Sequence, residues 1–212
     1  MGKPTRSSPP SYPLRERRKS RSRAALVTAA AELFAEVGYD QTTLEAVAER
    51  AELHVQTLYR HFPNKESLAL AADWDVLARF KKALRERDAS EPFHEFWRAW
   101  VMRRAERAIE RYPAAFLQRV RDRERVPRLA GEALAVWNEY LELLTVNLAK
   151  EMGVNPRSNR YPRLFAAMLW GGNQMAVRRW AESGGKLNLV KEVGYVVDDV
   201  VALLALWQGA RD

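Results

Sequence analysis

The sequence predicts an all-α protein made of a small N-terminal three-helix head and a larger C-terminal helical body. Apolar residues recur three and four positions apart, a spacing that places them on one side of an α-helix. Proline and glycine fall at the ends of these periodic stretches, and no segment shows a convincing strand pattern. We expect a basic disordered arm over residues 1–22, the head over 23–70 and the body over 71–212.

The composition is that of a soluble globular chain. Hydrophobic residues make up 47% and charged residues 29% of the 212 positions, enough to build a core. No apolar run approaches the roughly 18 residues of a membrane span, and the N-terminus lacks the apolar stretch of a secretion signal. Cysteine is absent, which excludes disulfides and thiolate metal sites. We expect a cytoplasmic protein with no membrane partner.

Positive charge is concentrated at the N-terminus. The chain carries a net charge of +8, and residues 1–23 hold eight Lys or Arg against the single acidic residue Glu16, so this segment accounts for +7. The same segment is rich in proline and serine and poor in apolar residues, which is typical of disorder. The rest of the chain is nearly neutral.

The head is expected to contain one long helix followed by two short ones. From about Arg23, apolar residues repeat at helical spacing up to Val37, and Gly38 is placed to end that helix. Thr42 or Thr43 caps the next helix, and only Thr42 would form a capping box with Glu45. A break at Glu52-Leu53 precedes a second short helix from about Val55 to Phe62. Two short helices joined this tightly are typical of a helix-turn-helix.

The remaining chain is expected to be helical with a few interruptions. Pro63 ends the second short helix, and Asn64 caps a longer helix that reaches about Leu84. From Pro92 onward the pattern is helical again. The expected breaks are at Pro113, near Pro127, at Gly153 to Pro162, and at Ser183-Gly184-Gly185.

Several segments of the head resemble the DNA-binding head of the TetR family: Leu33-Phe34-Ala35-Glu36-Val37-Gly38-Tyr39, Thr42-Thr43, Val47-Ala48, and Thr57 through Leu68. The resemblance covers about residues 23–70. It implies a sequence-specific DNA-binding transcriptional regulator, by default a repressor, with no enzymatic activity and no cofactor. It also implies an effector-binding and dimerisation body, and a pseudo-palindromic double-stranded DNA operator as partner.

Candidate DNA contacts follow from the geometry of a helix in the major groove, where early residues read bases and the flanks hold phosphates. Gln56 suits a bidentate pair with adenine, Thr57 a base edge or phosphate, and Val55 a thymine methyl. The other candidates are the helix-start residue Thr43 and the polar residues Tyr59, Arg60, His61 and Lys65. An ordinary helical hairpin is the alternative, and the charged residues of this set would be unusual in its core.

One part of the motif departs from the family. The turn normally has glycine, an apolar residue and serine, whereas this chain has Glu52-Leu53-His54. If the backbone keeps a positive φ, Glu52 costs roughly 1 kcal/mol relative to glycine, and His54 is a weaker helix cap than serine.

An aromatic cluster in the body is the candidate effector site. Any single aromatic residue is more often plain core, but by resemblance the set lies on helices around the family's effector cavity, which suits an apolar or amphipathic small molecule. The candidates are Trp97, Trp100, Phe116, Trp137 and Tyr140. A regulator without a small ligand is an open alternative.

The last two helices are expected to form a homodimer, because each carries an apolar stripe. These stripes are Leu164, Phe165, Met168, Leu169, Gly172, Met175 and Ala176, and Val190, Val193, Val197, Val200, Val201 and Leu204.

No catalytic or metal-binding pattern accompanies these features. The only histidines are His54, His61 and His94, none in metal-binding spacing. Ser183-Gly184-Gly185-Lys186 lacks the first glycine and the trailing Ser/Thr of a phosphate loop. The absence of paired carboxylates or a nucleophile with its base disfavours a helical enzyme or lipid carrier.

Overall fold

The computed structural model describes residues 13–111 and 113–209. These residues are helical in ten segments and contain no strand, which confirms the all-α expectation. The helices are α1 (Pro13–Glu36), α2 (Leu44–Arg50), α3 (Val55–His61), α4 (Lys65–Ala69), α5 (Ala71–Glu86), α6 (Phe93–Arg111), α7 (Pro113–Arg125), α8 (Pro127–Glu151), α9 (Tyr161–Glu182) and α10 (Leu189–Gly209).

The helices end close to where proline and glycine predict. α1 ends at Glu36, and Gly38 has a φ of 87°, the left-handed conformation that glycine adopts without strain. α7 and α8 begin at Pro113 and Pro127, where the missing amide N–H of proline costs nothing. The expected breaks at 153–162 and 183–185 are also confirmed.

Two boundaries differ from expectation. The helix predicted to begin near Arg23 already begins at Pro13, so the prediction of a disordered arm is wrong for residues 13–22. Leu14 and the Arg, Glu and Lys residues that follow are good helix formers, and they extend an existing helix without the cost of nucleation. Residues 1–12 of the expected arm lie outside the described residues. The single helix expected after Asn64 is divided into α4 and α5 at Leu70.

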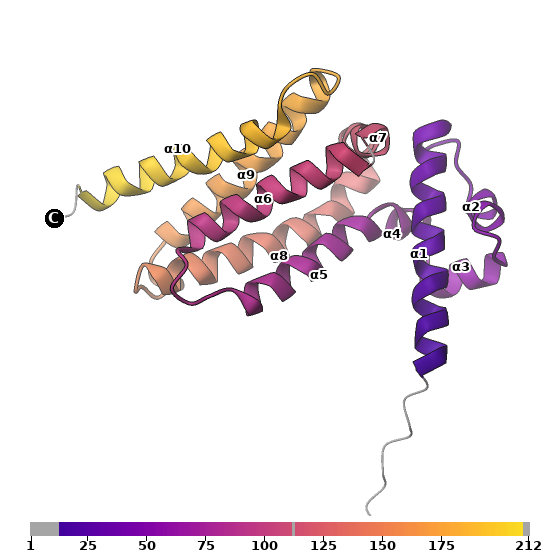
Figure 1. Ribbon diagram of the computed structural model, residues 1–212, viewed down its shortest axis with the longest axis horizontal. Coiled ribbons are helices and arrows are strands. Elements are labelled where there is room, and N and C mark those ends of the chain that lie inside the picture. The colour runs from indigo at the N-terminus through magenta and orange to yellow at the C-terminus, as the bar shows by residue number, and fades with distance from the viewer. Residues whose placement is uncertain (1–12, 112, 210–212) are drawn as a thin grey trace, which may run out of the picture.

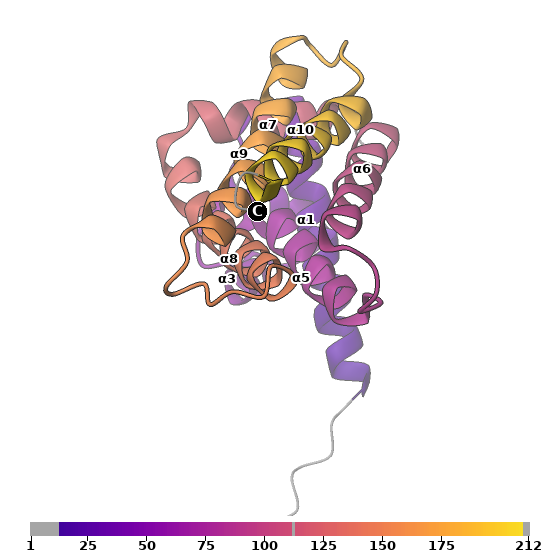
Figure 2. The ribbon, with the colours of Figure 1, turned by 90° about the vertical axis from the view of Figure 1, so that its left-hand side faces the viewer.

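The helices form a small head at one end of an elongated body. α2 and α3 lie along one side of α1, while α5, α6, α8, α9 and α10 run roughly lengthwise through the body and away from the head (Figure 1). Viewed from the end of the body that lies far from the head, the body helices cluster together with the head behind them (Figure 2). No helix in the described ranges is both long and apolar enough to cross a membrane.

Head and body have separate cores. The head core contains Leu26, Val47, Leu58 and Leu68, all with at most 2% of their surface exposed. The larger body core includes the aromatic cluster around Trp97. The head joins the body where α1 packs on α7 and α4 packs on α8.

Candidate nucleic-acid interface

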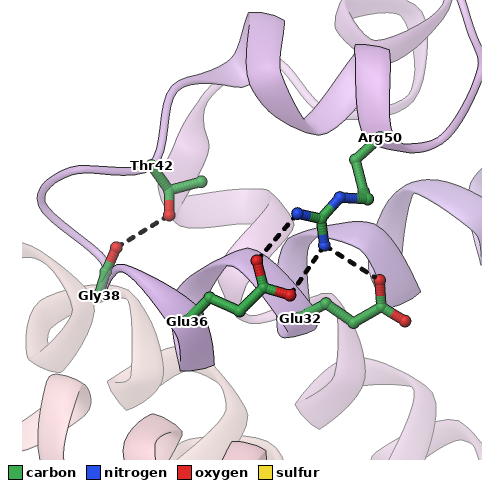
Figure 3. Close-up of polar contacts among 5 residues, drawn as sticks. All are labelled: Glu32, Glu36, Gly38, Thr42 and Arg50. Carbon is green, nitrogen blue, oxygen red and sulfur yellow. Dashed lines mark hydrogen bonds and ion pairs between the residues drawn. The ribbon is translucent and has the colours of Figure 1, made fainter.

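Two adjacent threonines stabilise the start of α2 through different hydrogen bonds. The Thr43 hydroxyl oxygen accepts a hydrogen bond from the Ala46 amide at 3.1 Å, so Thr43 is the N-cap. Thr42 is buried and donates its hydroxyl to the Gly38 carbonyl at 2.8 Å (Figure 3). Because Ala46 occupies the third helical position, the capping box with Glu45 does not form.

The turn between α2 and α3 keeps the backbone that glycine normally provides. Glu52 has a φ of 54°, so the condition under which a non-glycine residue is strained here is met. The Glu52 amide donates to the Glu49 carbonyl and the Leu53 amide to the Ala48 carbonyl, both at 2.9 Å. These two bonds form a Schellman motif, which satisfies carbonyls at the end of α2. His54 is the N-cap of α3 and makes no side-chain capping bond, as expected.

α3 buries one side and exposes the other. Leu58 is fully buried in the head core, and Val55 is half-buried against the same core. Gln56 and Arg60 are exposed, and Tyr59 exposes 49% of its surface. Thr57 is half-buried. The helix therefore presents polar and aromatic side chains to a partner while apolar residues hold it on the head.

His61, the last residue of α3, has a pKa below its ordinary value, which favours the neutral imidazole. Burial lowers its pKa, and the nearby cations Arg60, Lys19 and Arg23 lower it further. Its Nε2 is buried and has no hydrogen-bond partner among the described residues. A neutral ring keeps one N–H donor and one acceptor nitrogen.

Lys65 begins α4 and is held by the loop after α1. Its Nζ donates to the Asp40 carbonyl at 3.2 Å and lies 4.3 Å from the centre of the Tyr39 ring. Burial lowers the pKa of Lys65, and Asp40 and Glu66 partly oppose this shift. Asn64 and Ser67 form a reciprocal capping box, which places this helix start firmly.

The first turns of α1 add a basic groove beside α3 that was not predicted from the sequence. A cavity of about 830 Å³ lies between the start of α1 and the end of α3. Its lining residues are Leu14, Arg15, Glu16, Arg18, Lys19, Ser22 and Arg60. The run of positive charge was visible in the sequence. Because this segment was expected to be disordered, its location beside α3 could not be predicted.

The five aromatic effector candidates do not share one cavity. Trp97 is buried, with its ring centre 5.5 Å from Phe80, and half-buried Trp100 contacts Phe80 at 5.3 Å. Phe116 lines a cavity of about 540 Å³ between head and body. Trp137 and Tyr140 line a second cavity of about 480 Å³. Trp97 and Trp100 line neither of these two cavities.

The second cavity has an aromatic wall. Tyr140 stacks on Trp170 with ring centres 4.2 Å apart, and Trp137 meets Trp170 edge-on at 6.4 Å. Trp170 also lines this cavity and was not among the predicted effector residues. Its distance in sequence from the other aromatic residues concealed this neighbourhood.

Part of each predicted apolar stripe on α9 and α10 is buried in the core of the same chain. Phe165, Leu169 and Val197 are buried in the body core. In the α9 stripe, Leu164 and Met175 remain 50% exposed. No residue of the predicted α10 stripe is exposed, and the exposed leucines of α10 are Leu203 and Leu206, at 48% and 72%, which the stripe did not include. The two helices can approach closely because Gly172 has no side chain. A Cβ at this position would lie 2.4 Å from Val196 Cγ1. Only the exposed side chains are free for a partner.

A helix-turn-helix with an outward polar face, joined to a helical body with cavities, defines a DNA-binding transcriptional regulator. Residues 26–72 match the family described as "Bacterial regulatory proteins, tetR family". The chain is 33% identical over 181 residues to the HTH-type transcriptional regulator TcmR of Streptomyces glaucescens, covering 83% of this chain and 80% of that protein. The chain therefore belongs to the TetR family of transcriptional regulators.

Solved structures show the same fold. SmeT, the repressor of the Stenotrophomonas maltophilia multidrug efflux pump SmeDEF, superimposes with a TM-score of 0.66 at 20% identity, over 85% of this chain and 89% of that one. FadR from Bacillus subtilis, solved in complex with stearoyl-CoA, gives 0.64 at 19% identity, over 84% and 97%. The matched proteins are regulators and not enzymes.

Proposed function

We propose that this regulator is a repressor that binds a pseudo-palindromic operator as a homodimer and leaves it when a small molecule binds the body. The observation that carries the proposal is the exposed face of α3, where Gln56, Tyr59 and Arg60 point away from the head core. A helix anchored this way fits the major groove of B-DNA.

Base reading and phosphate contact fall to different residues. Gln56 is exposed early on α3, and its amide can pair with both N6 and N7 of adenine. Thr57 and Val55 are closer to the core and would meet a base edge or a thymine methyl only by close approach. Thr43, Tyr59, Arg60, His61 and Lys65 are proposed to hold phosphates on either side. Neutral His61 would serve as an N–H donor and not as a cation.

The basic groove beside α3 extends the proposed surface. Arg15, Arg18 and Lys19 line this groove together with Arg60. The DNA phosphates next to the α3 site would therefore lie close to these cations. Each neutralised phosphate adds affinity that falls with salt concentration. This surface would strengthen binding to every sequence without reading bases.

Dimerisation through α9 and α10 would place two heads on one operator. The exposed apolar residues Leu164, Met175, Leu203 and Leu206 support this assignment. A two-fold axis would then set the two recognition helices about 34–36 Å apart, or a larger helical-turn spacing.

Release by a small molecule is supported by the two cavities near the head. SmeT is named a repressor, and FadR from Bacillus subtilis was solved with stearoyl-CoA. We transfer to this chain only the general arrangement, an effector in the body that changes the position of the head. Such coupling requires that the ligand bind the released form more tightly than the DNA-bound form.

Footprinting on the DNA upstream of the chain's own gene tests the proposal. We expect protection of two related half-sites at protein concentrations that leave an unrelated fragment of equal length unprotected. A Gln56→Ala protein with an unchanged melting temperature should lose this protection. Equal protection of both fragments by the unaltered protein would contradict sequence-specific binding.

A further inference from the structure

The start of α5 connects the head to the body through two acidic residues. Asp75 accepts a hydrogen bond from Arg23 of α1 at 2.8 Å, which ties the start of α5 to the head. Asp73 contacts the body instead. It is 6% exposed, and its Oδ1 lies 3.9 Å from a guanidinium nitrogen of Arg104 on α6. The helix begins directly after Leu70, where α4 and α5 divide.

Asp73 lies among more arginines than it can neutralise. Burial raises the pKa of its carboxyl, but Arg119, Arg123 and Arg104 outweigh burial and hold that pKa below its ordinary value. Three cations therefore face one carboxylate. Burial also lowers the pKa of Arg119, which shows that its charge is poorly solvated. The Oδ2 atom of Asp73 has no hydrogen-bond partner among the described residues.

The acidic residues nearest this cluster in the sequence have other partners. Asp122 accepts a bond from Gln118 at 2.9 Å and lies 3.6 Å from Arg125. Glu124 accepts a bond from Arg178 at 2.7 Å. The excess positive charge around Asp73 is consequently not balanced by α7 itself.

The cluster opens onto the aromatic cavity. Asp73, Arg104 and Arg123 all line the cavity of about 480 Å³, whose apolar wall contains Trp137, Tyr140 and Trp170. The Nε1 donor of Trp170 is buried and has no hydrogen-bond partner among the described residues. Asp73 and Arg123 also line the cavity between head and body. The cavity thus combines aromatic surface with three arginines, Arg104, Arg123 and Arg178, and three carboxylates, Asp73, Glu124 and Glu182. Glu124 is engaged by Arg178, so Asp73 is the carboxylate that Arg104 and Arg123 share.

We propose that the effector of this regulator is a planar aromatic acid, whose anionic group binds Arg104 and Arg123 while its rings lie against Trp137 and Tyr140. This proposal rests on the proposed release by a small molecule and specifies its chemistry. A carboxylate or other oxyanion forms strong charge-assisted bonds with guanidinium groups, and aromatic rings favour an aromatic wall.

The same contact would transmit the signal. An incoming anion competes with Asp73 for the arginines, and Asp73 belongs to the start of α5, which Asp75 and Arg23 tie to the head. Loosening Asp73 would therefore release the joint at Leu70 and change the position of α1 to α3 relative to the body. The ligand favours that position because it replaces Asp73 as the partner of the arginines.

Two dyes of matched shape test the ligand class. 8-Anilinonaphthalene-1-sulfonate and N-phenyl-1-naphthylamine share an aromatic skeleton, but only the first carries an anionic group. Fluorescence titration of the full chain should show the sulfonate binding about tenfold or more tightly than the neutral dye. Arg104→Gln and Arg123→Gln should remove most of this preference and leave the neutral dye unaffected.

Further variants give the control and an effect of opposite sign. Arg103→Gln and Arg121→Gln change exposed arginines on the same two helices and should leave both dyes unaffected. Trp137→Ala should weaken both dyes. Asp73→Asn removes the competing carboxylate and should tighten the sulfonate, while Arg123→Lys should retain part of the preference.

The outcomes separate this proposal from the proposed function. Equal affinity for the two dyes, or a loss of both dyes in Arg104→Gln and Arg123→Gln at unchanged melting temperature, would overturn the assignment of an acidic ligand. Sulfonate binding that Trp137→Ala leaves unchanged would show that the dye binds elsewhere and would overturn the site. Operator footprinting uses no dye, so it can succeed when this proposal fails.

Discussion

Arg50 of α2 holds Glu36 at the end of α1 through two hydrogen bonds, 2.9 Å from Nη1 to Oε1 and 2.8 Å from Nη2 to Oε2 (Figure 3). Glu32 lies one turn earlier on α1, 3.6 Å from the same guanidinium. The bidentate geometry fixes the direction of both side chains. This contact joins the first helix of the helix-turn-helix to the long helix that supports it.

Replacing Arg50 with Gln should lower the melting temperature slightly, because a surface ion pair contributes little. The hydrogen bond from Arg50 lowers the pKa of Glu36 from its ordinary 4.5. The contribution is therefore complete above about pH 4.5 and is lost as the pH falls through the folded-state pKa. Thermal unfolding at several pH values measures it, with Arg103→Gln as an exposed control. A difference between Arg50→Gln and the unaltered chain that grows toward low pH would contradict this sign.

Substitutions at Glu52 should follow the backbone angle. Because its φ is 54°, Glu52→Gly should leave the free energy of unfolding unchanged or raise it by up to about 1 kcal/mol, and Glu52→Val should lower it. Urea unfolding of the three proteins gives the order. The neighbouring exposed residue Glu49 lies within α2, so Glu49→Gly should destabilise instead. If glycine at 52 destabilised as much as valine, the strain at this turn would be unimportant.

Gln56 and Lys65 should respond differently to removal. Gln56→Ala should cost about 1–3 kcal/mol on the preferred operator and much less on one changed at the contacted base. Lys65→Ala should weaken all sequences similarly and reduce the salt slope by about one. Binding at several salt concentrations to matched and altered operators separates the roles. An unchanged salt slope for Lys65→Ala would show that the Lys65 ammonium contacts only Asp40 and Tyr39 and no phosphate.

The basic start of α1 should contribute through salt-dependent binding only. Each of Arg15→Gln and Arg18→Gln should reduce the salt slope by about one if that side chain neutralises a phosphate, with base preference preserved. Arg157→Gln alters an exposed cation in the loop between α8 and α9 and serves as the matched control. If Arg15→Gln and Arg18→Gln left the salt slope unchanged, as Arg157→Gln should, the DNA contact of the groove would be refuted.

Charge placed on the exposed apolar side chains of α9 or α10 should break the dimer. Met175→Arg and Leu206→Arg should shift light scattering at micromolar concentration toward the monomer, because an unpaired charge cannot be buried at an apolar contact. Val146→Arg puts the same charge on an exposed apolar site of α8 and should leave the dimer intact. A monomeric unaltered protein would rule out this assembly.

Local rules account for most of the helices and for the DNA-binding head. Gly38, Pro113 and Pro127 mark helix ends because φ and the amide N–H are properties of the residue itself, and the sequence run from Thr57 to Leu68 identifies the family. The place of Glu52 in the turn indicated where a positive φ would be needed, and the structure shows that the backbone adopts it. The beginning of α1 could not, because composition indicated disorder while the preformed helix beyond Arg23 favours continued helix.

The sequence by itself determined the fold class, the helix-turn-helix and the exposed face of α3, since each depends on neighbours within a few residues along the chain. The tertiary structure alone decided which aromatic residues line a cavity and which are core. It separated Trp97 from Trp137, added Trp170 from another helix, and placed Asp73 among arginines 31 to 50 positions away in sequence. Cavities and buried charges are made by side chains that meet across helices, and helical periodicity carries no information about which distant faces will meet.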